Sequence, residues 1–145
     1  PYLIIDNEMM TALCLAAKNG VDVRIMTPGT PDKKLVFLLT QSYYRQLLEN
    51  GVKIYEYQPG FLHAKTFVCD DEIAVVGTIN LDYRSLYLHF EDGVWIYGND
   101  VIWSMKEDFV QTLEDCHTVP LEFCKNRKIP VRIMQNVLRA FAPML

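Results

Sequence analysis

The chain of 145 residues lacks an apolar run long enough to cross a membrane. A membrane-spanning helix needs about 18 consecutive apolar residues, and stretches such as Leu35 to Leu39 are far too short. Positive charge is not in excess either, because 14 Lys and Arg residues stand against 18 Asp and Glu residues, for a formal net charge of −4. A broad nucleic-acid-binding face is therefore not expected, although a local basic pocket would fit this composition.

The four cysteines follow no metal-binding or redox pattern. Cys14, Cys69, Cys116 and Cys124 form no C-x-x-C pair and no cluster with the spacing of metal ligands. We interpret them as buried free thiols of a protein in a reducing compartment, in preference to disulfides or zinc ligands.

The first residues already have the pattern of a strand, although the chain starts at Pro1 rather than at methionine. Because the strand pattern begins with the first residues, no signal peptide is expected. We expect residues 1–145 to form a single soluble lobe that has been cut from a longer protein.

What is present points to a folded domain. Half of the residues are hydrophobic and 22% are charged, which is typical of a chain with a sizeable core. The predicted strands cover residues 1–5, 21–26, 52–57, 63–69, 73–77 and 90–97, and the predicted helices cover 6–19, 35–50, 100–116 and 131–142. Strands that alternate with helices and then form a hairpin predict an α/β fold, with a mixed β-sheet flanked by helices.

Two basic side chains interrupt the fourth predicted strand, "HAKTFVC". Side chains alternate along a strand, so His63 and Lys65 are expected to share one face, with a spacing that suits one phosphate group. Asp70 lies at an odd offset from His63, which turns it to the opposite face, and it starts the predicted hairpin turn. We therefore prefer a structural role for Asp70.

Polar residues follow the next predicted strand in the segment "GTINLDYRS". Thr78 and Asn80 offer neutral hydrogen-bond donors just past a strand end, where ligands commonly bind in α/β domains. Glu91 opens the following predicted strand, and its carboxylate is expected to accept the second ring N–H of His63 and so to fix the tautomer. Arg84 and Ser85 are expected to hold this loop in place rather than to contact substrate.

These residues together match a known signature. The pattern H-x-K-x-x-x-x-D, followed after six residues by G-[ST]-x-N, resembles the motif of the phospholipase D superfamily. The matching residues are His63, Lys65, Asp70, Gly77, Thr78 and Asn80. The segments "PYLIID", "NGVDVRIMTPG", "NLDYRSLYLHFE" and "LRAFAPML" resemble the C-terminal catalytic lobe of bacterial cardiolipin synthases, so that the resemblance covers essentially the whole chain.

The resemblance implies a phosphatidyltransferase that makes cardiolipin from two phosphatidylglycerol molecules and releases glycerol. In this family one histidine forms a covalent phosphohistidine and the other acts as acid and base, without a metal or another cofactor. By analogy with second-lobe histidines we take His63 as the acid/base partner, while the residues themselves are equally compatible with a nucleophile. Lys65, Thr78 and Asn80 would bind phosphate, Glu91 would orient His63, and Asp70 would complete the motif.

The resemblance also implies an incomplete site. Enzymes of this group carry two such motifs, one in each lobe, whereas His89 and His117 start no second H-x-K pattern here. The first lobe or a second copy of this chain is therefore expected to complete the site. The expected partner is a phospholipid. The parent protein is expected at the bacterial cell membrane, in contact with the membrane surface.

Two alternatives to the transferase remain at this stage. One is a phosphodiesterase or nuclease of the same superfamily, although a nuclease would be expected to be more basic. The other is a lobe that serves binding or dimerisation without catalysis. The last predicted helix adds a further ambiguity, because its basic and apolar residues suit either a neighbouring lobe or an anionic membrane surface.

Overall fold

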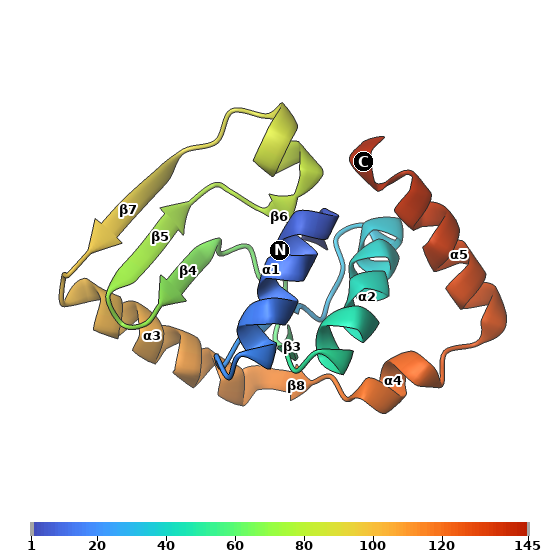
Figure 1. The fold of residues 1–145 in the computed structure, drawn as a ribbon, viewed down its shortest axis with the longest axis horizontal. Helices are drawn as coiled ribbons and strands as arrows, with labels where there is room; N and C mark the ends of the chain where they lie inside the picture. The colour runs from blue at the N-terminus through green and yellow to red at the C-terminus, as the bar shows by residue number, and fades with distance from the viewer. Residues whose placement is uncertain (1, 145) are drawn as a thin grey trace.

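The computed structural model describes residues 2–144 and confirms the α/β fold class (Figure 1). The strands are β1 (Leu3–Ile4), β2 (Arg24–Pro28), β3 (Lys53–Tyr57), β4 (Thr66–Cys69), β5 (Ile73–Gly77), β6 (Leu81–Asp82), β7 (Gly93–Tyr97) and β8 (Cys116–Thr118). The α-helices are α1 (Asn7–Lys18), α2 (Lys34–Glu49), α3 (Val101–Thr112), α4 (Leu121–Lys125) and α5 (Ile129–Ala140). A π-helical turn, η1 (Arg84–Leu88), and two 3-10 turns, η2 (Leu113–Asp115) and η3 (Ala142–Met144), connect them.

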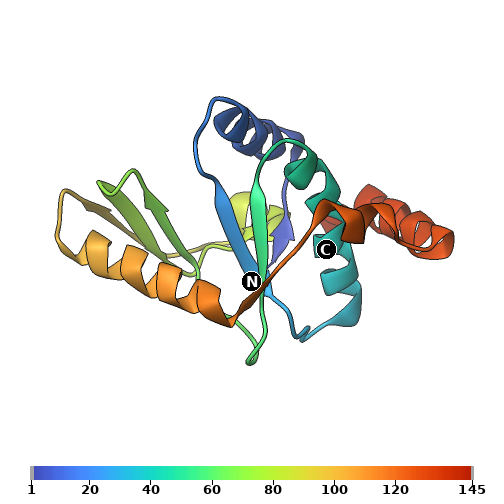
Figure 2. The same cartoon turned by 90° about the horizontal axis from the view of Figure 1, so that it is seen from below.

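Backbone pairing divides the described strands among three small sheets. β2 and β3 are parallel, and β8 joins β3 in the antiparallel direction, so this sheet is mixed. β4, β5 and β7 form an antiparallel meander, and β1 pairs with β6 in parallel. Helix α3 runs along one side of the meander, while α4 and α5 lie at the opposite edge of the molecule (Figure 2).

The core forms where α2 packs against β1 and β3. Leu39, Tyr44, Leu47 and Ile54 are all completely buried there, and each buried side chain of this size contributes roughly 2 kcal/mol of hydrophobic stabilisation. The phenol of Tyr44 is not left unpaired, because its oxygen lies 2.7 Å from the Thr27 hydroxyl. The buried side of α2 therefore holds β1 and β3 in place through hydrophobic contacts.

The helix boundaries predicted from local signals agree well with the structure. Asp6 caps α1, because its Oδ1 accepts a hydrogen bond from the Met9 backbone N–H at 2.7 Å. Gly20 and Gly51 follow α1 and α2 with φ of 93° and 94°, which a glycine adopts without steric cost. The last helix begins at Ile129, earlier than predicted, because Pro130 lies in its first turn, where a missing N–H costs no helical hydrogen bond.

Two other predictions are wrong, and two short strands were missed. The fourth strand begins at Thr66 rather than at His63, so alternation along a strand does not place His63 and Lys65. Cys69 is exposed, although Cys14 and Cys124 are buried as predicted and all four cysteines are free thiols. The short strands β6 and β8 were not predicted, because two or three residues carry no periodicity.

No helix within residues 2–144 is both long enough and apolar enough to span a bilayer.

Candidate active site

Three chain segments with polar residues meet at one edge of the meander. Because β4, β5 and β7 are antiparallel neighbours, the start of β4, the end of β5 and the start of β7 lie side by side. Lys65 precedes β4, Thr78 follows β5, and Glu91 precedes β7. The Gly77 N–H donates to the Lys65 carbonyl at 3.2 Å, and the Thr78 N–H donates to the Asp92 carbonyl at 2.9 Å. The sheet therefore brings together residues that are up to 26 positions apart in the chain.

The Lys65 ammonium group lies in the middle of this arrangement. Its Nζ donates to the backbone carbonyl of His63 at 2.7 Å, which ties the irregular segment before β4 to the lysine. Partial burial lowers the pKa of Lys65, while the nearby carboxylates of Glu91 and Asp82 act in the opposite direction. Burial is the largest of these causes, so the Lys65 side chain is partly shielded from water, which strengthens its attraction for an anionic group.

Glu91 has a different partner from the one that the sequence predicted. Its carboxylate accepts a hydrogen bond from the Thr78 hydroxyl, and it lies 3.9 Å from Nδ1 of His89. Within residues 2–144 no hydrogen bond joins Glu91 to the His63 ring, which lies beside the Phe61 ring at a centroid distance of 5.6 Å. The antiparallel pairing of β5 with β7 places Thr78 next to Glu91, whereas His63 lies outside the strand.

The hydrogen bond from Thr78 is the largest of the causes that lower the pKa of Glu91, followed by a hydrogen bond from Ser85. We therefore expect Thr78→Val, which removes the hydroxyl, to raise the pKa of Glu91 toward its ordinary value. Thr78→Ser keeps the hydroxyl and should leave the pKa unchanged. The measurement is a carboxyl NMR titration of the two variants and the wild type, and an equal Glu91 pKa in all three would contradict the assignment.

Asn80 has unused hydrogen-bonding capacity. Its Oδ1 is buried and has no hydrogen-bond partner within the part of the chain that the structure describes. Buried amide oxygens in folded proteins are normally paired, so an unpaired one calls for an explanation. The unpaired Oδ1 suits an N–H or O–H donor from outside the lobe, whereas the phosphate contact predicted for Asn80 would use its amide N–H groups, because phosphate oxygens accept hydrogen bonds.

Asp70 lies at the opposite end of β4 from the other motif residues. Asp70 and Asp71 have φ of 52° and 59°, and the Glu72 N–H closes the hairpin turn on the Cys69 carbonyl at 3.2 Å. The Lys106 ammonium bonds to Asp71 at 2.7 Å and fixes this turn to α3. The structure does not bring Asp70 to the edge where Lys65 lies, and its position agrees with a role in the turn.

Two residues that were not predicted as part of the site belong to it. Asp82 on β6 is buried, and its Oδ1 accepts the backbone N–H of Ser85 at 2.7 Å. The carboxylates of Asp82 and Glu91 both raise the pKa of Lys65, and a hydrogen bond from Ser85 lowers the pKa of Glu91. Because Ser85 is part of η1, these contacts connect η1 to the site. The N-x-D-x-R-S spacing in "NLDYRS" was the available signal, and the predicted loop-holding role of Ser85 fits its contact with Asp82.

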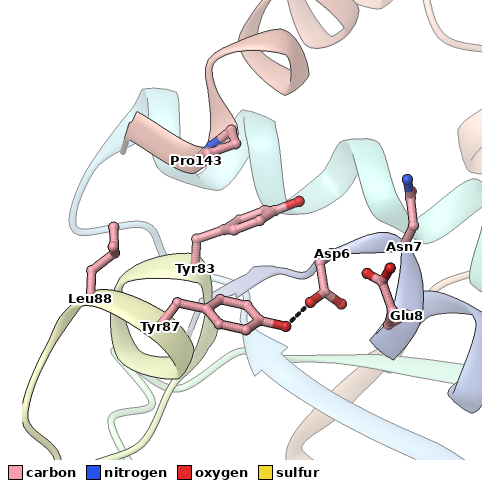
Figure 3. A pocket seen from close by; sticks show the side chains of 7 residues that line it. All are labelled: Asp6, Asn7, Glu8, Tyr83, Tyr87, Leu88 and Pro143. Atoms are coloured by element: carbon pink, nitrogen blue, oxygen red, sulfur yellow. Dashed lines mark hydrogen bonds between the residues drawn. The ribbon is translucent and has the colours of Figure 1, made fainter.

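A cavity of about 470 Å³ lies beside the site, between η1, the start of α1 and η3 (Figure 3). Its lining comprises Asp6, Asn7, Glu8, Tyr83, Tyr87, Leu88 and Pro143. The Tyr87 hydroxyl donates to the Asp6 carboxylate, which is also the cap of α1. The predicted site residues do not line this cavity, which is therefore distinct from the edge of the meander where Lys65 lies.

A metal site was not predicted. Over residues 2–144 the structure contains no group of three or more His, Cys, Asp and Glu side chains that could hold a metal ion.

Comparison with solved structures first defines the class of fold. The phospholipase D family member Nuc from Salmonella typhimurium matches with a TM-score of 0.70 and 18% identity, over 81% of this chain and 77% of that chain. A phosphatidylserine synthase from Haemophilus influenzae matches with a TM-score of 0.73 and 18% identity, over 99% of this chain and 38% of that chain. At this identity the likeness shows a shared fold, which is that of the phospholipase D family.

Comparison of sequences then defines the family. The family model described as "Cardiolipin synthase, PLD-like domain" matches residues 1–113, a range that includes every predicted site residue. The chain belongs to this family of phospholipase D-like domains. It is 46% identical to a cardiolipin synthase from Clostridium perfringens and 43% identical to one from Geobacillus kaustophilus, in both cases over its full length.

The chain is also 50% identical to an uncharacterised protein from Streptococcus mutans, again over its full length. It spans only 32% of that protein, 30% of the Clostridium enzyme and 29% of the Geobacillus enzyme. The segment after residue 113, which contains α4 and α5, lies beyond the family match.

Proposed function

We propose that this chain is one catalytic lobe of a phosphatidyltransferase that makes cardiolipin from two phosphatidylglycerol molecules and releases glycerol. The supporting observation is the convergence of Lys65, Thr78 and Glu91 at one edge of the meander, where the Lys65 ammonium bonds to the His63 carbonyl. Asn80 follows two residues after Thr78. Membership of the cardiolipin synthase domain family and the names of the relatives support a phospholipid substrate.

The residues at this edge suit a phosphodiester. The partly buried Lys65 supplies a positive charge close to the His63 backbone, and the side-chain amide of Asn80 supplies N–H donors. Such donors stabilise charge that develops on phosphoryl oxygens, and each one is typically worth about 3 kcal/mol in the transition state. Thr78 is already bonded to Glu91, so we assign it the task of positioning Glu91 in addition to that of a weaker phosphate contact.

The reaction would proceed in two balanced steps. In the first, a histidine nitrogen attacks the phosphorus of one phosphatidylglycerol, a nitrogen–phosphorus bond forms, and glycerol leaves with a proton from the second histidine. In the second, that histidine takes the proton from the head-group hydroxyl of another phosphatidylglycerol. The resulting oxygen nucleophile attacks the phosphorus and breaks the nitrogen–phosphorus bond. We assign the acid/base task to His63.

The nucleophilic histidine would come from outside this chain. Within residues 2–144 the other histidines are His89, whose ring faces the Phe90 carbonyl, and His117 on β8. Because the relatives are about three times as long as this chain, we propose that a first lobe of the same protein supplies the nucleophile, with a second copy of this chain as the alternative.

The test uses the full-length protein with vesicles of phosphatidylglycerol and analyses the lipid products by mass spectrometry. We expect cardiolipin and glycerol in equal amounts. Phosphatidic acid in place of cardiolipin would mean that water is the acceptor and that the protein is a phospholipase. The absence of lipid turnover by folded protein would contradict the proposal. The alternatives would then be an enzyme for another phosphodiester substrate or a lobe that serves binding without catalysis.

A further inference from the structure

A second cavity, of about 360 Å³, lies between α2, α4 and α5. The candidate active-site residues do not line it, and in Figure 1 these three helices lie on the opposite side of the fold from the meander. It is distinguished by its charge, because its lining contains Arg45, Arg127, Arg132 and Arg139 but, of the described acidic residues, Glu49 alone.

Three of the four guanidinium groups have no acidic partner in the part of the chain that the structure describes. Arg45 is paired with Glu49, with its Nε 2.9 Å from Oε1. Within residues 2–144 no carboxylate lies within 4.0 Å of Arg127, Arg132 or Arg139. Like charges that share one cavity repel one another, so an anion in the cavity would be stabilised by all three.

Two of these guanidinium groups are held in place without a ligand. Arg127 donates to Oε1 of Gln41 at 2.5 Å and lies over the Phe123 ring at 4.5 Å. Gln41 is itself buried and fixed by a 2.8 Å hydrogen bond to Glu56. Arg139 lies over the Tyr43 ring at 4.5 Å. Preorganised guanidinium forks match phosphate oxygens better than mobile ammonium groups do, so the chemistry points to a phosphate.

The orientation of α5 indicates where this phosphate comes from. Its polar residues Arg132, Gln135 and Arg139 line the cavity, and Gln135 is 7% exposed, with its Nε2 bonded to the Leu38 carbonyl at 3.1 Å. On the other side of the helix, apolar side chains that recur every four residues are exposed to solvent. They are Ile129, Ile133, Val137 and Phe141, with exposed fractions of 71%, 59%, 49% and 53%.

An ordinary surface helix buries its apolar side, whereas on α5 Leu138 packs against the core and these four apolar side chains are exposed. Figure 2 shows α5 at the outer edge of the molecule, beyond α2. A helix that lies in a membrane interface has this arrangement, with its apolar side in the acyl-chain boundary and its basic groups at the level of the lipid phosphates.

We propose that the cavity between α2, α4 and α5 binds the phosphate of an anionic phospholipid, outside the active site, while the apolar side of α5 lies in the membrane interface. Arg127, Arg132 and Arg139 contact the phosphate, and the acyl chains run beside Ile129 and Ile133. This site binds lipid and does not react with it, so it does not depend on the proposed transfer reaction.

The test uses the full-length protein in the His63→Ala background, where the proposed turnover is blocked. Vesicles contain phosphatidylglycerol with a photoactivatable group in its acyl chain, and labelled peptides from residues 129–144 are quantified by mass spectrometry. We expect labelling of this segment, a reduction of about tenfold in Arg132→Gln/Arg139→Gln, and competition by excess sn-glycerol 3-phosphate. A phosphatidylcholine probe of the same design should label this segment less.

The matched control is Lys125→Gln/Lys128→Gln, which removes the same charge from exposed residues of the same region that do not line the cavity. Its labelling should change less than twofold. Thermal unfolding of both variants checks the fold, and Arg132→Gln alone replaces the double variant if loss of the Arg139–Tyr43 contact impairs folding. Equal losses in both double variants, or no labelling of wild-type α5, would overturn the proposal.

A further experiment distinguishes a lipid phosphate from soluble inorganic phosphate as the ligand of this cavity. Inorganic phosphate that protects these arginines from phenylglyoxal, without any labelling of α5 by the lipid probe, would overturn the assignment to a phospholipid.

Discussion

His63→Ala in the full-length protein is expected to lower the rate of cardiolipin formation by about 10³-fold or more, because proton transfer by a positioned histidine typically contributes 10² to 10⁴-fold. His63 is exposed and, within the described chain, no hydrogen bond from its ring is present. Its removal should therefore leave the unfolding temperature unchanged. The measurement is the initial rate of cardiolipin formation from phosphatidylglycerol vesicles, at equal amounts of folded enzyme.

His117→Ala is the matched control, because His117 is also an exposed histidine but lies on β8, away from the meander. Its rate should stay within about twofold of the wild type. A His63 variant that keeps more than a tenth of the wild-type rate would exclude His63 as the acid/base group. Equal losses in both histidine variants would point to a general effect on folding instead.

Gly77→Ala is expected to lower the free energy of unfolding by about 2–3 kcal/mol and to abolish lipid turnover. A methyl group on Gly77 would lie 2.1 Å from the Asp92 carbonyl oxygen and 2.8 Å from the Gly93 Cα, which are backbone atoms at the entry to β7. Backbone cannot swing aside as a side chain can, so β5 and β7 must separate. That separation would also break the Thr78–Asp92 hydrogen bond and move Thr78 from Glu91.

Gly60→Ala tests whether this effect is specific, because its added methyl group would meet no atom within 4 Å. We expect its unfolding free energy to stay within about 0.5 kcal/mol of the wild type. Urea denaturation, followed together with the rate of cardiolipin formation, gives both quantities. A Gly77→Ala protein as stable as Gly60→Ala would show that the strands tolerate the methyl group and that the close approach is not required.

The residues of the candidate site could be predicted because their spacing is a fixed signature, but their contacts could not. Glu91 was predicted to orient His63, yet it accepts from Thr78, because strand pairing selects the nearest donor across the meander. Asp82 was not predicted at all, since its proximity to Lys65 depends on the pairing of β6 with β1, far away in the chain.

The sequence by itself determined the features that depend on neighbours within a few residues. These include the Asp6 cap of α1, the glycines that end α1 and α2, and the hairpin turn at Asp70, since capping and backbone conformation are local effects. It also determined family membership, through a motif whose residue types and spacing can be recognised without coordinates.

Only the tertiary structure decided which groups face each other. The two-residue strands β1 and β6 form because each provides the other's hydrogen bonds, a contact between residues that are 78 positions apart. The sequence likewise indicated that the last helix carries basic and apolar residues but not which of them face outward, and the packing of Gln135 and Arg139 against α2 left Ile129, Ile133 and Val137 exposed. Secondary-structure propensity depends on residues that are close in the chain, whereas contacts between distant residues depend on the packing of the whole lobe.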